Sequence, residues 1–209
     1  MKLLNTMVAL SALGFAAAGI AGPQNVTITT VSANGSGCPD GSTMIDISPD
    51  RQVFTAIFSK FQAVIDPGNP SINYADRQKR CDLSLRVHVP NGWQFSVFKA
   101  DYEGWYDLQQ NMQFVQTSTY HFQGNARHAK SSTITTQQAP KSGNFRFEDK
   151  VGTESVEWSA CGGPRNLLIS AEIRLSSANP HSRGAAGIDA IEGQFKMLAR
   201  FGLNWRQCQ

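Results

Sequence analysis

Apolar and polar residues alternate along several stretches of this 209-residue chain, and this pattern restricts the possible folds more than any other feature. In Leu83–Val89, every second residue is Leu or Val, and Ser84, Arg86 and His88 lie between them. Leu167–Leu175 repeats the pattern. A period of two places alternate side chains on opposite faces of a strand, so that one face can pack while the other meets water. The alternation therefore predicts half-buried β-strands.

Shorter alternating stretches account for much of the remaining chain. The further predicted strands are Val26–Val31, Gln52–Phe58, Trp93–Val97, Phe114–Phe122, Ser131–Thr136, Asn144–Phe147, Glu154–Ser159 and Arg200–Arg206. Two stretches are ambiguous: Gln52–Ile65 also fits a short helix, and Ile188–Leu198 has a weak pattern. Roughly ten strands without a clear amphipathic helix favour an antiparallel sandwich or barrel. We expect an all-β, jelly-roll-like antiparallel β-sandwich.

The first 21 residues have the features of a secretory signal peptide. Lys2 precedes an apolar stretch that reaches Ile20, and the helix-breaking pair Gly22-Pro23 follows Ala21. Small residues near Ala21 are what a signal peptidase requires, and polar residues interrupt the stretch too often for a membrane anchor. We expect residues 1–21 to be removed and residues 22–209 to form a single secreted domain with no membrane segment.

Four cysteines follow this leader: Cys38, Cys81, Cys161 and Cys208. An even number of cysteines in a secreted chain predicts disulfides, and four cysteines allow three pairings. We favour Cys38–Cys81 with Cys161–Cys208, because these sequential pairs enclose stretches of similar length. The close cysteine spacing of a zinc site is absent from the sequence. We expect neither a metal nor another cofactor.

Because secreted proteins can be N-glycosylated, two acceptor sequons near the start of the mature chain are relevant. Asn25-Val26-Thr27 and Asn34-Gly35-Ser36 both fit the acceptor pattern, whereas proline excludes Asn69-Pro70-Ser71. We therefore expect glycans, where they occur, only at Asn25 and Asn34, near the start of the mature protein.

Aromatic residues are concentrated between positions 93 and 122, which hold nine of the 20 in the chain. Tyr102, Trp105 and Tyr106 lie among acidic residues, in what we interpret as a loop after a strand. Aromatic rings on a loop can stack on sugar rings, while a carboxylate such as Asp101 accepts hydrogen bonds from hydroxyls. We predict that these four residues bind a ligand. The alternative is an aromatic lid that only covers the end of a sheet.

Catalysis by paired carboxylates is a weaker hypothesis. Glu157 and Glu172 fall at polar positions of predicted strands, and Asp101 and Glu103 form a second pair. A chain with 16 acidic residues contains such pairs by chance, and the sequence has no Gly-x-Ser-x-Gly motif. We expect no catalytic residues, with Glu157 and Glu172 as the candidates if the protein is an enzyme.

The order of several short motifs resembles that of a known family. The motifs are Gly35–Pro39, Ser48–Asp50, Asp76–Arg77, Lys79, Cys81–Leu83, Pro90–Val97, Asp101–Gly104, Trp158–Gly162 and Trp205–Cys208. They resemble the secreted fungal and bacterial family catalogued as domain of unknown function 4360, over nearly the whole chain after the leader. The resemblance implies a secreted, disulfide-bonded, β-rich protein and transfers no catalytic residue. Glu103 departs from the family, in which a basic residue is expected, so no anionic partner is implied at that position.

The charge of the chain limits its partners. The formal net charge is only +3, and the basic residues Arg77, Lys79 and Arg80 form a short run that we interpret as a solvated turn. Nucleic-acid-binding chains carry a denser basic surface, so we expect no nucleic-acid partner. We expect a monomeric, non-catalytic extracellular protein that binds a cell-wall polysaccharide or an extracellular or host-surface component. The alternatives are a small glycan-active hydrolase and a secreted, effector-like interaction protein.

Overall fold

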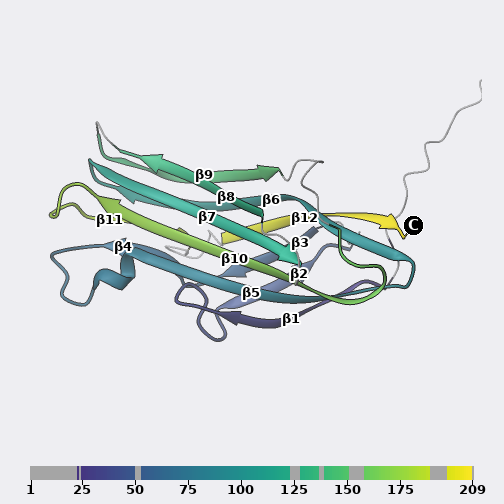
Figure 1. Ribbon diagram of the computed structural model, residues 1–209. Helices are drawn as coiled ribbons and strands as arrows, with labels where there is room; N and C mark the ends of the chain where they lie inside the picture. The colour runs from purple at the N-terminus through teal and green to yellow at the C-terminus, as the bar shows by residue number, and fades with distance from the viewer. Residues whose placement is uncertain are drawn as a thin grey trace, which may run out of the picture.

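Two antiparallel sheets lie against each other in the computed structural model of the chain (Figure 1). The structure describes residues 23, 25–49, 53–122, 128–136, 139–150, 158–188 and 197–208. The first sheet has the strand order β1-β5-β10-β7-β8, and the second has the order β2-β3-β12-β6-β11-β4 with β9 added to β6. The all-β, antiparallel sandwich expected from the alternation is confirmed. The predicted signal peptide lies outside the described residues.

Nearly all of the regular structure in the described residues is strand. The elements are β1 (Thr27–Asn34), β2 (Thr43–Ile47), β3 (Val53–Phe58), β4 (Phe61–Ile65), the 3-10 helix η1 (Tyr74–Arg77), β5 (Gln78–Val89), β6 (Trp93–Leu108), β7 (Met112–Phe122), β8 (His128–Thr135), β9 (Lys141–Lys150), β10 (Gly163–Ser177), β11 (Gly184–Ile188) and β12 (Met197–Gln207). Within these described parts, no helix has the length and apolar character needed to cross a membrane.

Strand β6 organises the second sheet. One of its edges pairs with β12 over Trp93–Tyr102 and with β11 over Trp105–Leu108, while β9 pairs with its other edge over Lys99–Leu108. Strands β3 and β4 follow beside β12 and β11 in the same way. The segments β11 and β12 thus share one position in the sheet, and β3 and β4 share the next.

The core lies between the sheets and follows the alternation in the sequence. Every second residue of β5, β7 and β10 is buried over most of each strand. Phe95 from the second sheet meets Phe122 from the first in an edge-to-face contact, with ring centroids 5.0 Å apart. Burying an aliphatic or aromatic side chain of this size stabilises the fold by about 1.5–3 kcal/mol. Burial of the apolar side chains that alternate along these strands is therefore the main force that holds the two sheets together.

Two disulfides join the sequential pairs that the cysteine spacing favours. Cys38 and Cys81 are both 0% exposed and fix the loop after β1 to β5. The second bridge joins Cys161, which is exposed, to Cys208 just beyond β12. Closing loops of these lengths stabilises a fold by about 4 kcal/mol each when the constraint acts on the unfolded chain.

The structure differs from the expected strands at Trp158–Ser159 and at strands β2 and β11. Residues 154–157 of the predicted strand Glu154–Ser159 lie outside the described residues, and Trp158 and Ser159 are not in a strand. Ser159 instead donates its backbone N–H to the carbonyl of Phe95, 2.8 Å away. The ambiguous stretch Gln52–Ile65 contains β3 and β4 and no helix among its described residues, and β2 and β11 have no counterpart among the predicted strands.

We expect a mild reductant to open the Cys161–Cys208 disulfide before the Cys38–Cys81 disulfide. A thiolate must reach a sulfur atom to attack it, and Cys38 and Cys81 are both fully buried. Alkylation after timed exposure to dithiothreitol, followed by peptide mass spectrometry, measures the order. Simultaneous labelling of all four cysteines would show that the two bridges open only with global unfolding.

Candidate functional site

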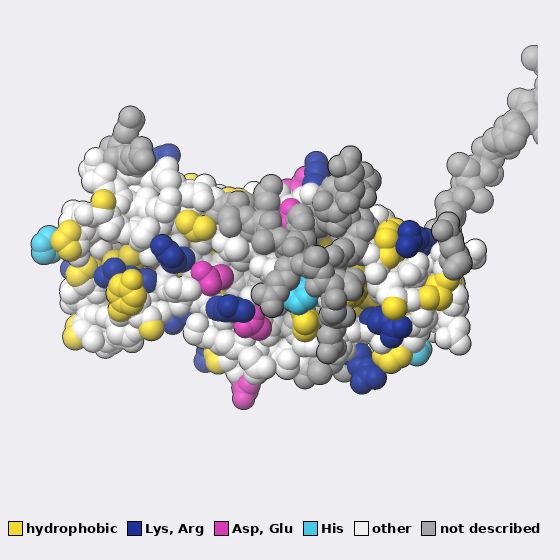
Figure 2. All heavy atoms as spheres, in the orientation of Figure 1, with side chains coloured by type: hydrophobic (Ala, Val, Ile, Leu, Met, Phe, Trp, Pro, Cys, Tyr) yellow, Lys and Arg dark blue, Asp and Glu magenta, His cyan; other side chains and the backbone are white. Residues whose placement is uncertain are grey.

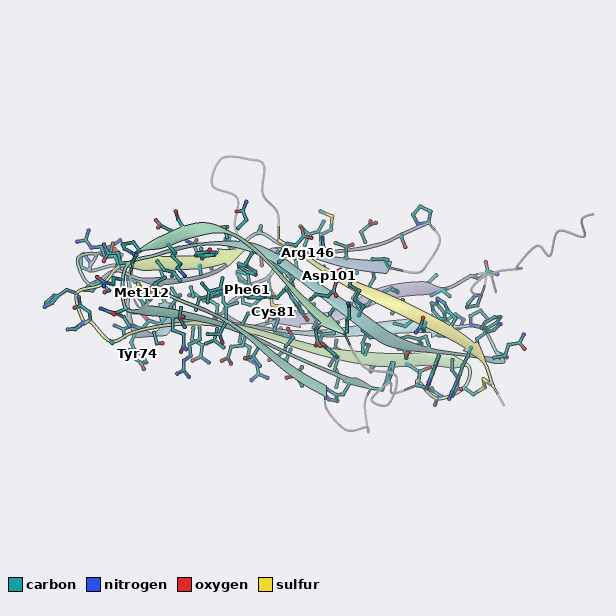
Figure 3. The ribbon with its side chains drawn as sticks, turned by 90° about the horizontal axis from the view of Figure 1, so that it is seen from above. Phe61, Tyr74, Cys81, Asp101, Met112 and Arg146 are labelled. Atoms are coloured by element: carbon teal, nitrogen blue, oxygen red, sulfur yellow. A yellow bond between two sulfur atoms is a disulfide. The ribbon has the colours of Figure 1, made fainter. Side chains whose placement is uncertain are left out.

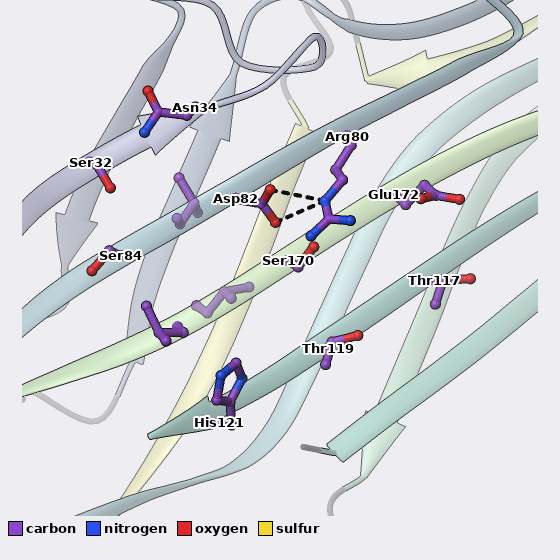
Figure 4. A pocket seen from close by; sticks show the side chains of 13 residues that line it. Ser32, Asn34, Arg80, Asp82, Ser84, Thr117, Thr119, His121, Ser170 and Glu172 are labelled. Carbon is purple, nitrogen blue, oxygen red and sulfur yellow. Dashed lines mark hydrogen bonds and ion pairs between the residues drawn. The ribbon is translucent and has the colours of Figure 1, made fainter. Parts of the chain in front are cut away.

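The outer face of the first sheet contains a hollow of about 390 Å³ (Figure 4). Its lining residues come from β1, β5, β10 and β7: Ser32, Asn34, Arg80, Asp82, Leu83, Ser84, Thr117, Thr119, His121, Leu168, Ile169, Ser170 and Glu172. Most of these side chains occupy the polar phase of the strands, opposite the core. The hollow therefore brings hydroxyl, amide, carboxylate, guanidinium and imidazole groups together on one face.

Strand pairing arranges these side chains in rows across the sheet. The first row holds Arg80, Glu172 and Thr117; the second holds Asn34, Asp82, Ser170 and Thr119; the third holds Ser32, Ser84, Leu168 and His121. Neighbouring strands are about 4.8 Å apart, and successive rows are separated by about 6–7 Å. The face is therefore a regular grid of hydrogen-bonding groups.

An ion pair on β5 joins two charged residues of the grid. Arg80 Nε donates to both carboxylate oxygens of Asp82, at 3.0 and 2.9 Å. Hydrogen bonding to Asp82 raises the pKa of Arg80, so the guanidinium stays charged. Both contacts use Nε, which leaves the terminal N–H groups of the guanidinium for a ligand. An exposed pair of this kind adds little to stability, so its position matters more than its energy.

His121 contributes a polar atom whose hydrogen bonding is incomplete. Its Nδ1 is buried and has no hydrogen-bond partner among the described residues. A buried polar atom without a partner costs about 1–3 kcal/mol, and a ligand that bonds to it recovers part of that cost.

The interpretation of Tyr102, Trp105 and Tyr106 as a loop is wrong. All three belong to β6, which pairs with β9 over this stretch, and hydrogen bonding along both edges keeps the backbone extended. Val97 pairs with Leu203 and Lys99 with Gly202, so Phe98 is an extra residue that shifts the phase of the strand. The shift explains why alternation alone did not predict this part of β6.

The four predicted binding residues do not form one surface. Tyr102 is 2% exposed, and burial raises the pKa of its phenol. Tyr106 packs against the core on the same side, whereas Trp105 is half-buried and occupies the opposite phase. Tyr102 therefore has no surface on which a sugar could stack.

Asp101 belongs to a ladder of ion pairs on β6 and β9. Its carboxylate lies 3.2 Å from both Lys99 Nζ and Arg146 Nη2, and Figure 3 shows Asp101 and Arg146 close together. Arg146 also contacts Glu103 at 3.2 Å. The suggested Asp101–Glu103 pair is thus bridged by a cation. Of the other suggested pair, Glu172 lines the hollow and Glu157 lies outside the described residues.

Most of the residues in the hollow were not singled out from the sequence. The sequence feature that could have identified them is the set of polar residues that alternate with apolar ones in Leu83–Val89, Phe114–Phe122 and Leu167–Leu175. This alternation predicts that the polar side chains face outward. Which strands become neighbours cannot be deduced from that signal. Asn34, one of the two predicted glycosylation sites, also lines the hollow, while Asn25 is exposed before β1.

Adjacent residues of β9 show opposite electrostatic environments. Hydrogen bonds from Lys150 and Lys99 lower the pKa of Glu148 to about 2. Asp149 points the other way and is 3% exposed, and this burial raises its pKa. The charge of Glu148 therefore stabilises the fold, whereas the charge of Asp149 opposes it.

Comparison with known proteins gives one family and one curated relative. The family model described as "Domain of unknown function (DUF4360)" matches residues 24–208. A protein of Arthroderma benhamiae described as "Uncharacterized secreted protein" is 35% identical over 186 residues, which is 89% of this chain and 73% of that protein. Together with the two disulfides, this relationship shows that the protein is secreted.

Two solved structures are weakly similar. TmCBM61 in complex with beta-1,4-galactotriose is 10% identical with a TM-score of 0.23, covering 90% of this chain and 92% of that one. The enzymatically active domain of bacteriophage CBA120 tailspike protein 4 is also 10% identical with a TM-score of 0.23, covering 88% of this chain and 20% of that one. Neither similarity bears on what this chain binds.

We expect Asp149→Asn to stabilise the protein at pH 7 by on the order of 1 kcal/mol, the cost that a buried polar group typically carries. A raised pKa means that the folded state holds this proton more tightly than the unfolded chain does. Wild-type stability therefore falls as the pH rises above the ordinary value of 3.8, and the variant lacks this loss. Thermal melts between pH 3 and pH 8 measure the difference, which should vanish at the acidic end.

Glu148→Gln is the matched control with the opposite sign. It should be less stable than wild type at pH 7 and approach wild type as the pH falls from 4.5 toward 2, where Glu148 itself becomes protonated. Equal pH profiles for the two variants would contradict the assignment of opposite environments.

Proposed function

We propose that this chain, which is secreted and belongs to the family described as domain of unknown function 4360, binds a polysaccharide along the outer face of its first sheet. The observation that carries the proposal is the hollow of about 390 Å³ lined by rows of polar side chains from four strands. A ligand that matches such a grid presents many hydroxyl groups at regular intervals. Sugar chains have this chemistry.

The composition of the hollow suits a polyol. Asn34, Ser170 and Thr119 offer both donors and acceptors, and the Arg80–Asp82 pair adds charged groups, which form stronger hydrogen bonds with neutral partners. Leu168 and the His121 ring lie in the same row and offer apolar surface to the C–H face of a sugar. Because the rows extend over four strands, the hollow suits a chain of sugars better than a single small molecule.

The second sheet presents a different kind of outer surface. Several charged residues of β6 and β9 contact one another: Lys99 is engaged by Asp101 and Glu148, and Arg146 by Asp101 and Glu103. A ligand there would have to displace existing ion pairs. The first sheet is therefore the better candidate, even though the aromatic residues predicted to bind lie on β6.

We propose binding without catalysis. Glycoside hydrolysis needs a carboxylic acid that donates a proton and a second carboxylate that acts as base or nucleophile. The hollow contains Asp82 and Glu172, and Asp82 accepts two hydrogen bonds from Arg80. Both carboxylate oxygens of Asp82 are thus held by a cation, so the hollow does not present two carboxyl groups that are open to the two sides of a glycosidic bond.

We expect a His121→Ala/Glu172→Ala double variant to lose about 5- to 150-fold in affinity, because two hydrogen bonds of about 0.5–1.5 kcal/mol each are removed. Affinity is measured by retention on insoluble cellulose, chitin and β-glucan, and by calorimetry with soluble xylan and polygalacturonate. Trp105→Ala is the control, since Trp105 lies on the other sheet. Thermal melts show whether each variant is folded.

Two results would overturn the proposal. One is that folded wild-type protein binds none of these polysaccharides. The other is that Trp105→Ala abolishes binding while the double variant binds normally, which would place the ligand on the second sheet.

A further inference from the structure

A second hollow, of about 670 Å³, adjoins the first and shares Arg80 with it. It lies where η1, the start of β5 and the end of β10 meet. Four cationic side chains line it, from Arg77, Lys79, Arg80 and Arg174, and none of its described lining residues is acidic. The run of basic residues that the sequence presents as a solvated turn therefore forms one side of a positively charged hollow.

The exposed aromatic side chain of Tyr74 lines this hollow. Tyr74 is 81% exposed, and Met44 is the only other large apolar side chain that is comparably exposed among the described residues. Figure 3 shows Tyr74 on the outside of the sandwich. The Arg77 guanidinium lies over the ring, 4.9 Å from its centroid. An exposed ring with a cation stacked on it offers one flat surface and one charge to the same ligand.

Hydrogen bonds hold the turn that carries these two residues. The Asn73 side chain accepts from the Ala75 N–H at 2.8 Å, and Asp76 accepts from the Asn73 N–H at 2.9 Å. Asp76 also contacts Lys79 Nζ at 2.7 Å, and Lys79 is the main cause of the lowered pKa of Asp76. Tyr74 and Arg77 are therefore positioned before any ligand arrives.

The cations of the hollow differ in how far they are neutralised. Lys79 is paired with Asp76, and Arg80 is paired with Asp82. Arg174 is exposed and forms no ion pair with any described residue, and Arg77 is engaged only by the Tyr74 ring among the described residues. Two guanidinium groups thus remain without a carboxylate partner in this part of the chain.

We infer that this second hollow binds an anionic sugar, so that the polysaccharide recognised by the protein carries carboxylate or sulfate groups. The inference rests on the proposed function, because the hollow continues the polysaccharide surface along β5 and β10. A guanidinium fork binds a carboxylate or a sulfate through two parallel hydrogen bonds, and the Tyr74 ring covers the C–H face of the same sugar.

The test compares three soluble polymers: polygalacturonate, its methyl-esterified form, which lacks the charges, and dextran sulfate. Calorimetry at low and high NaCl should show that at least one anionic polymer binds more tightly than the esterified one and weakens as salt screens the charges. A preference for polygalacturonate assigns the hollow to carboxylates, and a preference for dextran sulfate assigns it to sulfates.

Substitutions locate the charge-dependent part of the affinity. Tyr74→Ala and Arg174→Ala should each weaken binding of the preferred anionic polymer about tenfold, the usual effect of removing one charged hydrogen bond or one stacking contact. Arg174→Ala should leave the affinity for the esterified polymer unchanged, because that polymer lacks the charge that Arg174 would bind. Arg206→Ala removes the same charge near the C-terminus, which lies at the opposite end of the sandwich from β4 in Figure 1, and should have no effect. Arg206 lies on β12 and Arg174 on β10, so the control is matched in charge and differs in position. Figure 2 shows basic side chains at both ends of the face it presents.

The outcomes separate this inference from the proposed function. If the esterified polymer or another neutral polysaccharide binds through His121 and Glu172, while Tyr74→Ala and Arg174→Ala bind polygalacturonate and dextran sulfate like wild type, only the anionic-sugar site is overturned. Equal losses in Arg174→Ala and Arg206→Ala would also overturn it, because net charge alone would then explain binding. If no carbohydrate binds, both proposals fail.

Discussion

Hydrogen bonding along both edges of β6 is the interaction on which the second sheet depends. Strands β12 and β11 occupy one edge in succession, and β9 occupies the other. The close fit also depends on glycine: a Cβ at Gly104 would come within 2.6 Å of the Phe145 ring, and one at Gly187 within 2.6 Å of β4. The second sheet in turn supplies the apolar face that buries the inward side of β5, β7 and β10. The outer face of these strands, with both hollows, is positioned as a result.

Strands that alternate cleanly were predictable from the sequence, and so was the class of fold. Leu83–Val89 and Leu167–Leu175 bury every second side chain in the structure, as a period of two requires. Two of the segments that were not predicted have a clear physical reason. Phe98 shifts the phase of β6, and β11 is built mainly from Gly and Ala, whose small side chains give no hydrophobic pattern.

The candidate site was harder to predict from the sequence than the fold. The polar phase of each strand identifies outward-facing residues, but the hollow exists because β10 lies between β5 and β7. These pairings join residues far apart in the chain, such as Asp82 with Ser170. The aromatic residues of β6 were predicted to bind because a sequence shows which residues are aromatic but not which of them are buried. Tyr74, the exposed ring, lies outside that concentration and next to a run of basic residues that has no distinctive motif.

The position of Asn34 has a consequence for how the protein is produced. Its side chain lines the hollow on the first sheet, and it begins an acceptor sequon. A glycan attached there would occupy the space in which a polysaccharide would lie, so the attached sugar and the ligand would exclude each other sterically. Protein from a host that does not glycosylate and protein from one that does would then present different surfaces, although their folds are the same.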